Sequence, residues 1–390
     1  MNASPGNFRL ETAVTNLPTG RARASWRGDL ITIVLGLWLV AGVFVDGFAH
    51  NNLRGSLESF FTPWHAVLYS GFTVCATWIS WMIWREFRAG RRGLNAVPVG
   101  YEWGMAGVFV FGLGGLGDMI WHTVFGIEIG TSALLSPTHL MLLSGGVLIL
   151  GSPARSAWLE TGTGETRGVN LRALGFQTPG FRAPSFLAFL PALLSVFAAY
   201  SFIAFMHMYL WGVTSVPAES GYLSWIAERG GEWSVEQAHR EAASGILFSN
   251  IIVIGTALLL LRRWKTPFGT FAFLYGLNTL AMTAMLDGSP DWKRVIPSLV
   301  GGLFADVLVR FWEPRPERLW QWRAFAGLVP LVFWGMHFAG LAIMGNGIGL
   351  KLEFWTGITV MSALSGVLLS VLMSPTPAPI PASSSQAEAH

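Results

Sequence analysis

The sequence predicts an all-α fold, a polytopic integral membrane bundle of about ten transmembrane helices built from tandem helical hairpins. Of the 390 residues, 52% are hydrophobic and only 12% are charged, whereas a soluble domain carries about 25% charged residues. Apolar runs of about 18 residues or more, the length that crosses a bilayer, recur along the chain. The lipid bilayer is therefore the first partner that the sequence implies.

Hydropathy divides the chain into an N-terminal tail (1–28), a transmembrane domain (29–374) and a Pro/Ala/Ser-rich C-terminal tail (375–390) that we expect to be disordered. The fourth membrane helix is short and Gly-rich, and the eighth carries Asp306 and Arg310, which we expect to pair because they lie four residues apart. The ten helices are predicted near residues 29–50, 61–84, 101–124, 136–151, 184–212, 242–262, 267–286, 295–312, 324–346 and 353–374.

Basic residues precede the first predicted helix and follow every even-numbered one. Because cytoplasmic loops carry an excess of Lys and Arg, both termini should lie in the cytoplasm of the cell (inner or plasma) membrane. The odd-numbered connections, which include 51–60, 125–135 and 213–241, should then face outward. The net charge of +3 comes from these basic loops and gives no indication of nucleic-acid binding. The single cysteine, Cys75, excludes an intramolecular disulfide.

The first two outward connections carry one motif, Asp-x-x-x-His, a loop, then Ser/Thr-Pro-x-His-x-x-x-x-Ser-Gly. Residues four apart share a helix face, so the Asp and the first His present a carboxylate and an imidazole together. The Ser or Thr suits a helix N-cap and the Pro suits the first helical position, which places the second His in the first turn of the next helix. The three side chains should converge at the mouth of a hairpin. The copies contain Asp46, His50, Thr62, Pro63, His65, Ser70 and Gly71, and Asp118, His122, Ser136, Pro137, His139, Ser144 and Gly145.

An Asp and two His residues form a donor set for a transition metal, because imidazole suits copper, zinc, iron or nickel. The alternative is that these residues only hydrogen-bond to one another and cap helix ends. Two complete copies favour metal or proton chemistry, because ionisable groups inside a membrane are expensive and usually functional. The sequence therefore predicts one metal site at Asp46, His50 and His65 and another at Asp118, His122 and His139.

A partial third copy of the motif follows, in which His239 precedes a Ser-Gly step and Ile203 stands at the Asp position before His207. His207 and His239 either complete a shared site, orient the ligands of the other sites, or do neither. The loop carboxylates Glu58 and Glu128 are similarly ambiguous. The alternative for the whole repeat is helix packing, with Ser-Gly as a close-contact step and His as a cap.

The motif resembles one of the membrane subunits of the particulate methane and ammonia monooxygenases, the copper membrane monooxygenases, which carries Asp-x-x-x-His, a short acidic loop and Phe-Thr-Pro-x-His. Residues 46–71 match it well and residues 118–145 less closely. The resemblance implies copper at Asp46, His50 and His65 and, by extension, at the second triad. This chain differs in its longer gap between the His residues, its duplicated motif and its additional helices.

We therefore expect a membrane metalloprotein of oxidoreductase, monooxygenase-like type, with copper, or alternatively zinc or iron, near the outer face. Partner membrane proteins or a homo-oligomer are compatible with this expectation. A small apolar substrate would fit beside aromatic residues expected to exclude water, namely Phe61, Trp64, Tyr69, Trp121 and Phe125. The alternatives are a proton- or metal-coupled transporter or sensor, for which Asp306, Arg310, Asn250 and Asn278 offer the polar path, and a structural membrane protein that docks a partner.

Overall fold

The computed structural model describes residues 20–53, 60–126, 130–159 and 186–374. Within these ranges the chain is helical and forms no strand, which confirms the predicted all-α fold. The α-helices are α1 (Trp26–Asn52), α2 (Pro63–Arg88), α3 (Glu102–Phe125), α4 (Thr131–Leu134), α5 (Pro137–Leu150), α6 (Ser152–Trp158), α7 (Phe186–Met206), α8 (Ser220–Arg263), α9 (Thr270–Asp287), α10 (Trp292–Trp312), α11 (Leu319–Met344) and α12 (Leu352–Leu372).

Eight of the described helices are long and apolar enough to cross a membrane, which shows a multi-pass membrane protein. The pair α5 and α6, bent by 41° at Gly151, gives a ninth span if counted as one. The predicted span at 267–286 forms α9 but is not among the eight, because Asn278, Thr279 and Thr283 lower its hydropathy. These three side chains are buried among other helices rather than turned toward lipid.

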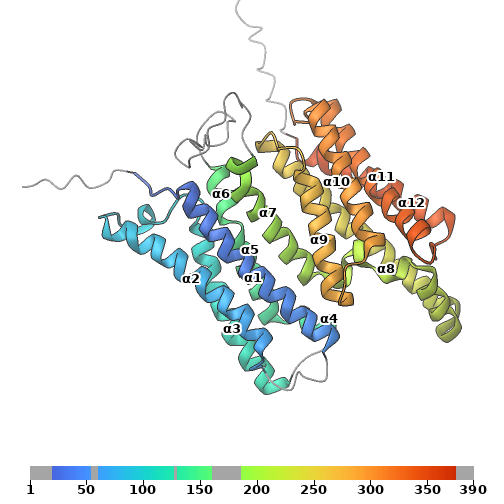
Figure 1. Cartoon of the computed structure of the whole chain (residues 1–390), viewed down its shortest axis with the longest axis horizontal. Helices are drawn as coiled ribbons and strands as arrows, with labels where there is room; N and C mark the ends of the chain where they lie inside the picture. Colours follow the sequence, from blue (N-terminus) through green and yellow to red (C-terminus); the bar gives the residue numbers. More distant parts are fainter. Residues whose placement is uncertain (1–19, 54–59, 127–129, 160–185, 375–390) are drawn as a thin grey trace, which may run out of the picture.

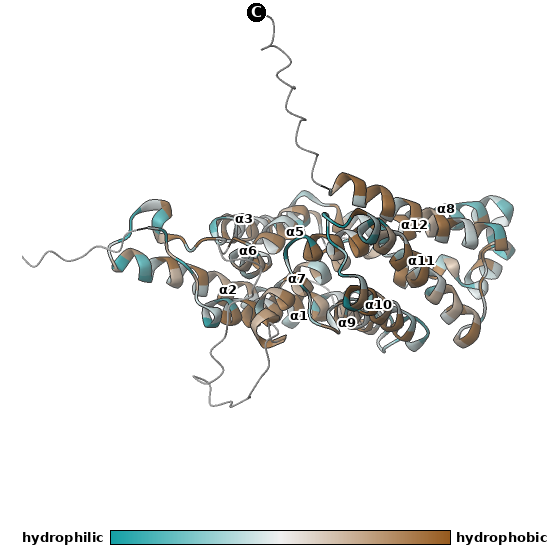
Figure 2. Ribbon diagram, turned by 90° about the horizontal axis from the view of Figure 1, so that it is seen from above, coloured by the Kyte–Doolittle hydropathy of each residue, from teal (hydrophilic) through white to brown (hydrophobic). Residues whose placement is uncertain are grey.

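The long helices lie side by side, with α2 and α3 at one edge and α11 and α12 at the other (Figure 1). Helix α1 packs on α2, α7 and α9, so α1, α7 and α9 form the middle of the bundle. Apolar residues cover most of the long helices (Figure 2). Many of them are on the surface, such as Phe109 at 67% exposure and Leu364 at 63%. A soluble protein rarely exposes so much apolar surface, whereas a bilayer accommodates it.

Four of the five expected hairpins are packed helix pairs, α1 with α2, α3 with α5, α9 with α10, and α11 with α12. The third differs, because α7 packs on α1 and α5 whereas α8 packs mainly on α12. The chain between them forms 3-10 turns at 208–210, 212–214 and 216–218. Most of the expected outward connection 213–241 is helical, since α8 already begins at Ser220 and changes direction at Gly231, whose φ is 65°. The expected terminal tails lie largely outside the described residues, but Ala22 is fully buried and bonded to Asn95 and Val99.

Glycines bring α1 and α2 into close contact. A Cβ on Gly42 would lie 2.6 Å from Leu68 Cα, and one on Gly71 would lie 2.7 Å from Leu39 Cα. Only glycine permits such an approach of two backbones, so these positions fix how the antiparallel helices are aligned.

Helices α3 and α5 make equivalent contacts. A Cβ on Gly145 would lie 2.5 Å from Phe111 N, and one on Gly114 would lie 3.1 Å from Leu142 N. Both pairs thus carry a contact glycine four residues before the Asp of the motif and another six residues after its second His. These residues are Gly42, Asp46, His65 and Gly71 in the first pair, and Gly114, Asp118, His139 and Gly145 in the second.

The expected ion pair between Asp306 and Arg310 is not formed. The Asp306 carboxylate instead accepts hydrogen bonds from the backbone N–H groups of Phe271 and Ala272, at 3.1 and 3.0 Å. These N–H groups belong to the first turn of α9 and have no partner within their own helix. Asp306 therefore caps α9 from α10, an arrangement that also places a carboxylate at the positive end of a helix dipole.

Candidate metal centre

The two helices that supply the second His of each motif begin as the sequence predicts. Thr62 caps α2, with its hydroxyl accepting the His65 N–H at 3.1 Å, and Pro63 is the first helical residue. Ser136 caps α5 in the same way and accepts the His139 N–H at 3.3 Å. The capped first turn fixes the backbone of each His at the mouth of its hairpin.

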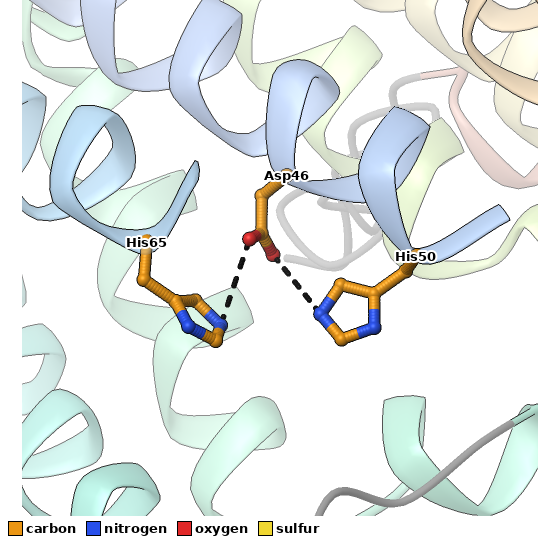
Figure 3. Close-up of side chains that lie close together, drawn as sticks. All are labelled: Asp46, His50 and His65. Atoms are coloured by element: carbon orange, nitrogen blue, oxygen red, sulfur yellow. Dashed lines mark ion pairs between the residues drawn. The ribbon is translucent and has the colours of Figure 1, made fainter. Parts of the chain in front are cut away.

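In the first triad, Asp46 lies between the two imidazoles (Figure 3). Its Oδ2 is 3.7 Å from His50 Nε2, one turn further along α1, and its Oδ1 is 3.6 Å from His65 Nε2 on α2. One potential ligand atom from each residue lies within 4.8 Å of the others. The structure thus brings together the three residues that the motif predicts.

The second triad is built the same way from α3 and α5. Asp118 Oδ1 is 3.4 Å from His122 Nε2 and 3.5 Å from His139 Nδ1. The three residues again offer ligand atoms within 4.8 Å of one another. These triads are the only groups of three or more such residues in the described parts of the chain.

Hydrogen bonds orient one imidazole in each triad. His65 Nδ1 lies 2.7 Å from the Phe60 carbonyl oxygen, and His122 Nδ1 lies 3.2 Å from the Gly126 carbonyl oxygen. A carbonyl oxygen only accepts, so Nδ1 carries the proton in both rings and the neutral ring turns the lone pair of Nε2 toward the Asp. Two acceptors then face each other, an arrangement that a bound cation would stabilise.

The hypothesis that Asp and His only bond to each other fits the distances poorly. The separations of 3.4 to 3.7 Å exceed the usual range of about 2.7–3.2 Å for an N–H···O hydrogen bond. Asp46 Oδ1 is buried and has no hydrogen-bond donor among the described residues. By contrast, ligands held about 2.0–2.1 Å from one ion in a tetrahedral site lie roughly 3.3–3.4 Å apart. The triads are spaced more like metal ligands than like hydrogen-bonded pairs.

The two triads line one cavity of about 340 Å³ rather than two separate sites. The ring centroids of His65 and His122 are 6.2 Å apart. Tyr69, one turn after His65 on α2, donates a hydrogen bond from its hydroxyl to Asp118 Oδ2 at 3.0 Å. The sequence predicted both triads but not that they would be neighbours, because the packing of one hairpin on the other leaves no local pattern.

The carboxylates of the two triads have different surroundings. Asp118 accepts hydroxyl hydrogen bonds from Tyr69 and, at 3.4 Å, from Thr138. The residues at the corresponding positions of the other copy are Leu143, which has no donor, and Trp64, which makes no hydrogen bond to Asp46. The repeated motif therefore yields two unequal sites.

Helix α7 and the turn after it supply a wall of the cavity that the sequence analysis missed. Of the aromatic residues expected there, only Tyr69 lines the cavity, while Phe61 and Phe125 are 79% and 67% exposed. Their side chains point away because they lie beyond the helix faces that carry the ligands. The wall is formed instead by Phe111, Phe202, Phe205, Met206, Met208 and Tyr209.

His207 and His239 belong to neither triad. His207 Nδ1 bonds to the Ile203 carbonyl at 2.9 Å and its ring lies 5.1 Å from that of Phe248. His239 lies 3.8 Å from a Glu236 oxygen and stacks on a Phe354 ring. His207 nonetheless marks the right segment, because its neighbours Met206 and Met208 line the cavity. Glu58 and Glu128 lie outside the described residues.

The polar residues expected to form a transport path have local partners. Asn278 donates to Ser201, and Asn250 donates to Ser365 and to the Ser362 carbonyl. These bonds connect helices to one another, as polar side chains commonly do in membrane proteins.

The fold and the site together define a polytopic helical membrane protein with two adjacent Asp/His/His groups at one end of its bundle. No protein-family model, curated protein or solved structure matches the chain. The resemblance to the copper membrane monooxygenases therefore stays a prediction based on the motif.

Proposed function

We propose that the protein is a membrane-embedded oxidoreductase of monooxygenase-like type that binds two transition-metal ions, one in each triad. The observation that carries the proposal is the pairing, in both triads, of a His Nε2 lone pair with a buried carboxylate oxygen at a separation longer than a hydrogen bond. Removing a charge from water is costly unless a partner compensates it, and a cation held by all three residues is such a partner.

The donor set and the cavity favour copper among the candidate metals. Two imidazoles and one carboxylate suit copper, zinc or iron better than the hard ions magnesium and calcium, which prefer oxygen ligands. The thioethers of Met206 and Met208 face the same cavity and are soft donors that favour copper(I). Bound copper would supply one-electron chemistry and a position for dioxygen.

The chain's own residues would hold the ions and keep the site dry. His65 and His122 are oriented by backbone carbonyls, so their Nε2 atoms stay available to a metal. Phe111, Phe202 and Phe205 give the cavity an apolar wall that accommodates a small apolar substrate and excludes water.

The bundle has a basic end opposite the triads, which supports a cell-membrane location with both termini in the cytoplasm. Arg21 and Arg155 both pair with Glu102, and Arg263 donates to the Trp158 carbonyl at the same end. The triads would then lie near the outer face. Cysteine labelling tests this orientation, since a cysteine at the start of α8 should react from outside and one beside Arg88 only from inside.

The carrier alternative has less support, because Asn250, Asn278 and Asp306 are engaged in bonds between helices. A fixed site at one end of the bundle explains the two triads without a path across it.

The proposal is tested by counting metal ions on the purified protein. We expect wild type to hold two copper ions per chain, and His65→Ala and His139→Ala each to lose one while retaining helix content by circular dichroism. His239→Ala is the matched control, because it removes a His at the same end of the bundle that belongs to neither triad, and it should keep both ions. Unchanged copper content in both triad variants would refute the metal assignment, and tight binding of zinc alone would refute the redox assignment.

A further inference from the structure

A second hollow opens on the surface between α2 and α3, beside the cavity that holds the triads. It has a volume of about 660 Å³. Its lining follows α2 from Pro63 to Thr73, a length of about 15 Å at the rise of an α-helix. The hollow exists because α2 and α3 each pack on their hairpin partner and touch each other only slightly. We call it the α2–α3 groove.

The groove opens toward lipid. Both of its helices are candidate membrane spans, and their outer faces carry exposed apolar residues such as Leu113 and Leu116. No Asp, Glu, Lys or Arg lines it. The hydroxyl of Thr73 donates to the Tyr69 carbonyl and that of Thr62 accepts the His65 N–H, so both are already engaged. These features fit an occupant that is uncharged, apolar and dissolved in the bilayer.

The groove and the cavity share a wall made of His65, Tyr69 and Phe111. Tyr69 is held across α3 by its hydrogen bond to Asp118, and it passes over Gly115, where a Cβ would lie 2.7 Å from the Tyr69 ring. Removal of the Tyr69 ring from this position would join the two spaces. Rotation of one aromatic side chain is a motion available to a folded protein, because it leaves the helices in place.

We propose that the α2–α3 groove binds small uncharged apolar molecules from the lipid phase and delivers them past Tyr69 to the metal cavity. The proposal deepens the proposed function, on which it rests for the role of the cavity, by assigning the class of substrate and its route. Water-soluble molecules would not take this route, since the groove offers no free polar group.

Photolabelling in lipid nanodiscs tests the route without any metal. A small apolar aryl diazirine, dissolved in the bilayer, loses N₂ on illumination, and the resulting carbene inserts into a nearby C–H or O–H bond. Mass spectrometry then compares labelling at Tyr69 with labelling at the lipid-facing Phe109, which is 67% exposed. We expect both residues to be labelled in the metal-free wild type.

Gly112→Trp should close the groove. A Cβ on Gly112 meets only Phe72, at 3.6 Å, so a larger side chain fits there and extends along the groove. We expect labelling of Tyr69 to be lost while labelling of Phe109 stays. Leu113→Trp is the matched control, because it adds the same indole one residue further on, at a 61% exposed position outside the groove lining. Gly112→Leu repeats the test if the Trp variant fails to fold.

The route is refuted if Tyr69 is unlabelled in wild type, or if it is labelled equally in the folded Gly112 and Leu113 variants. Metal content is measured on the same preparations. Loss of Tyr69 labelling in Gly112→Trp with no metal bound by any variant would support the groove and refute the proposed function, whereas two bound metals with an unlabelled Tyr69 would do the reverse.

Discussion

Substitution of Gly71 by alanine should damage the first triad from a distance. The new Cβ would lie 2.7 Å from Leu39 Cα and 2.8 Å from Leu39 N, both of them backbone atoms that cannot rotate away. Ordinary contact begins at 3.4 Å, so α1 and α2 must separate by roughly 0.7 Å at this point. Overpacking of this kind typically costs about 1–3 kcal/mol of stability.

The separation acts against metal binding. His65 Nε2 and Asp46 Oδ1 are already 3.6 Å apart, and binding to one ion requires about 3.3–3.4 Å. Gly71→Ala should therefore weaken the first triad by about 10–100-fold, the range seen when groups that support metal ligands are lost. Gly145→Ala should do the same to the second triad, because its Cβ would lie 2.5 Å from Phe111 N.

Cobalt(II) absorption titrations measure this effect if only one triad is left intact. In a His139→Ala background only the first triad remains, so Gly71→Ala should raise its Kd and Gly145→Ala should not. In a His65→Ala background the order should be reversed. Gly112→Ala is the control, since its Cβ meets nothing closer than 3.6 Å. Equal weakening of both triads by either glycine variant would refute the argument, because it would indicate general loss of structure.

Three further predictions concern single side chains. Tyr69→Phe should weaken metal binding at Asp118 more than at the first triad, although Tyr69 is on α2, because a hydrogen bond to a charged group is worth about 1.5–3 kcal/mol; equal Kd changes in the two single-triad backgrounds would contradict this. Thr62→Ala should cost about 1 kcal/mol in denaturant unfolding through loss of the α2 cap, and an unchanged midpoint would contradict it. Asp306→Asn should lower the melting temperature and leave metal content unchanged, since its carboxylate caps α9; loss of metal would instead favour the carrier alternative.

The parts of the site that obey local rules could be predicted from the sequence. Asp46 and His50 share a helix face because they are four residues apart, and Thr62 and Pro63 start α2 because their chemistry suits the cap and the first turn. The same rules placed the second triad. Such rules need only the spacing of residues along one helix and the identity of the helix ends.

The rest of the site depends on which helices pack together. Phe202 and Phe205 reach the cavity because α7 packs on α1 and α5 instead of forming a hairpin with α8. One available signal was not used, namely the glycine four residues before each Asp, Gly42 and Gly114, which marks the helix contact beside each triad.

Asp306 shows how a local rule gives the wrong partner. Its spacing from Arg310 predicts a pair on one helix face, a contact worth about 0.2–0.5 kcal/mol on an exposed helix. Two unsatisfied N–H groups at the buried start of α9 compete for the same carboxylate, and leaving each one unpaired would cost about 1–3 kcal/mol. The larger cost decides the outcome, and it cannot be recognised before the neighbouring helix is known.

The same comparison of costs explains why two copies of one motif give unequal sites. The Asp118 carboxylate already has two hydroxyl donors, so part of the cost of burying it is met by the protein itself. The Asp46 carboxylate has an oxygen with no donor, so more of its burial cost is left for a bound cation to offset. Metal should therefore stabilise the fold more through the first triad than through the second. Since Tyr69 follows His65 on α2 and bonds to Asp118, a shift of α2 on loading the first triad would also move a hydrogen-bond donor of the second.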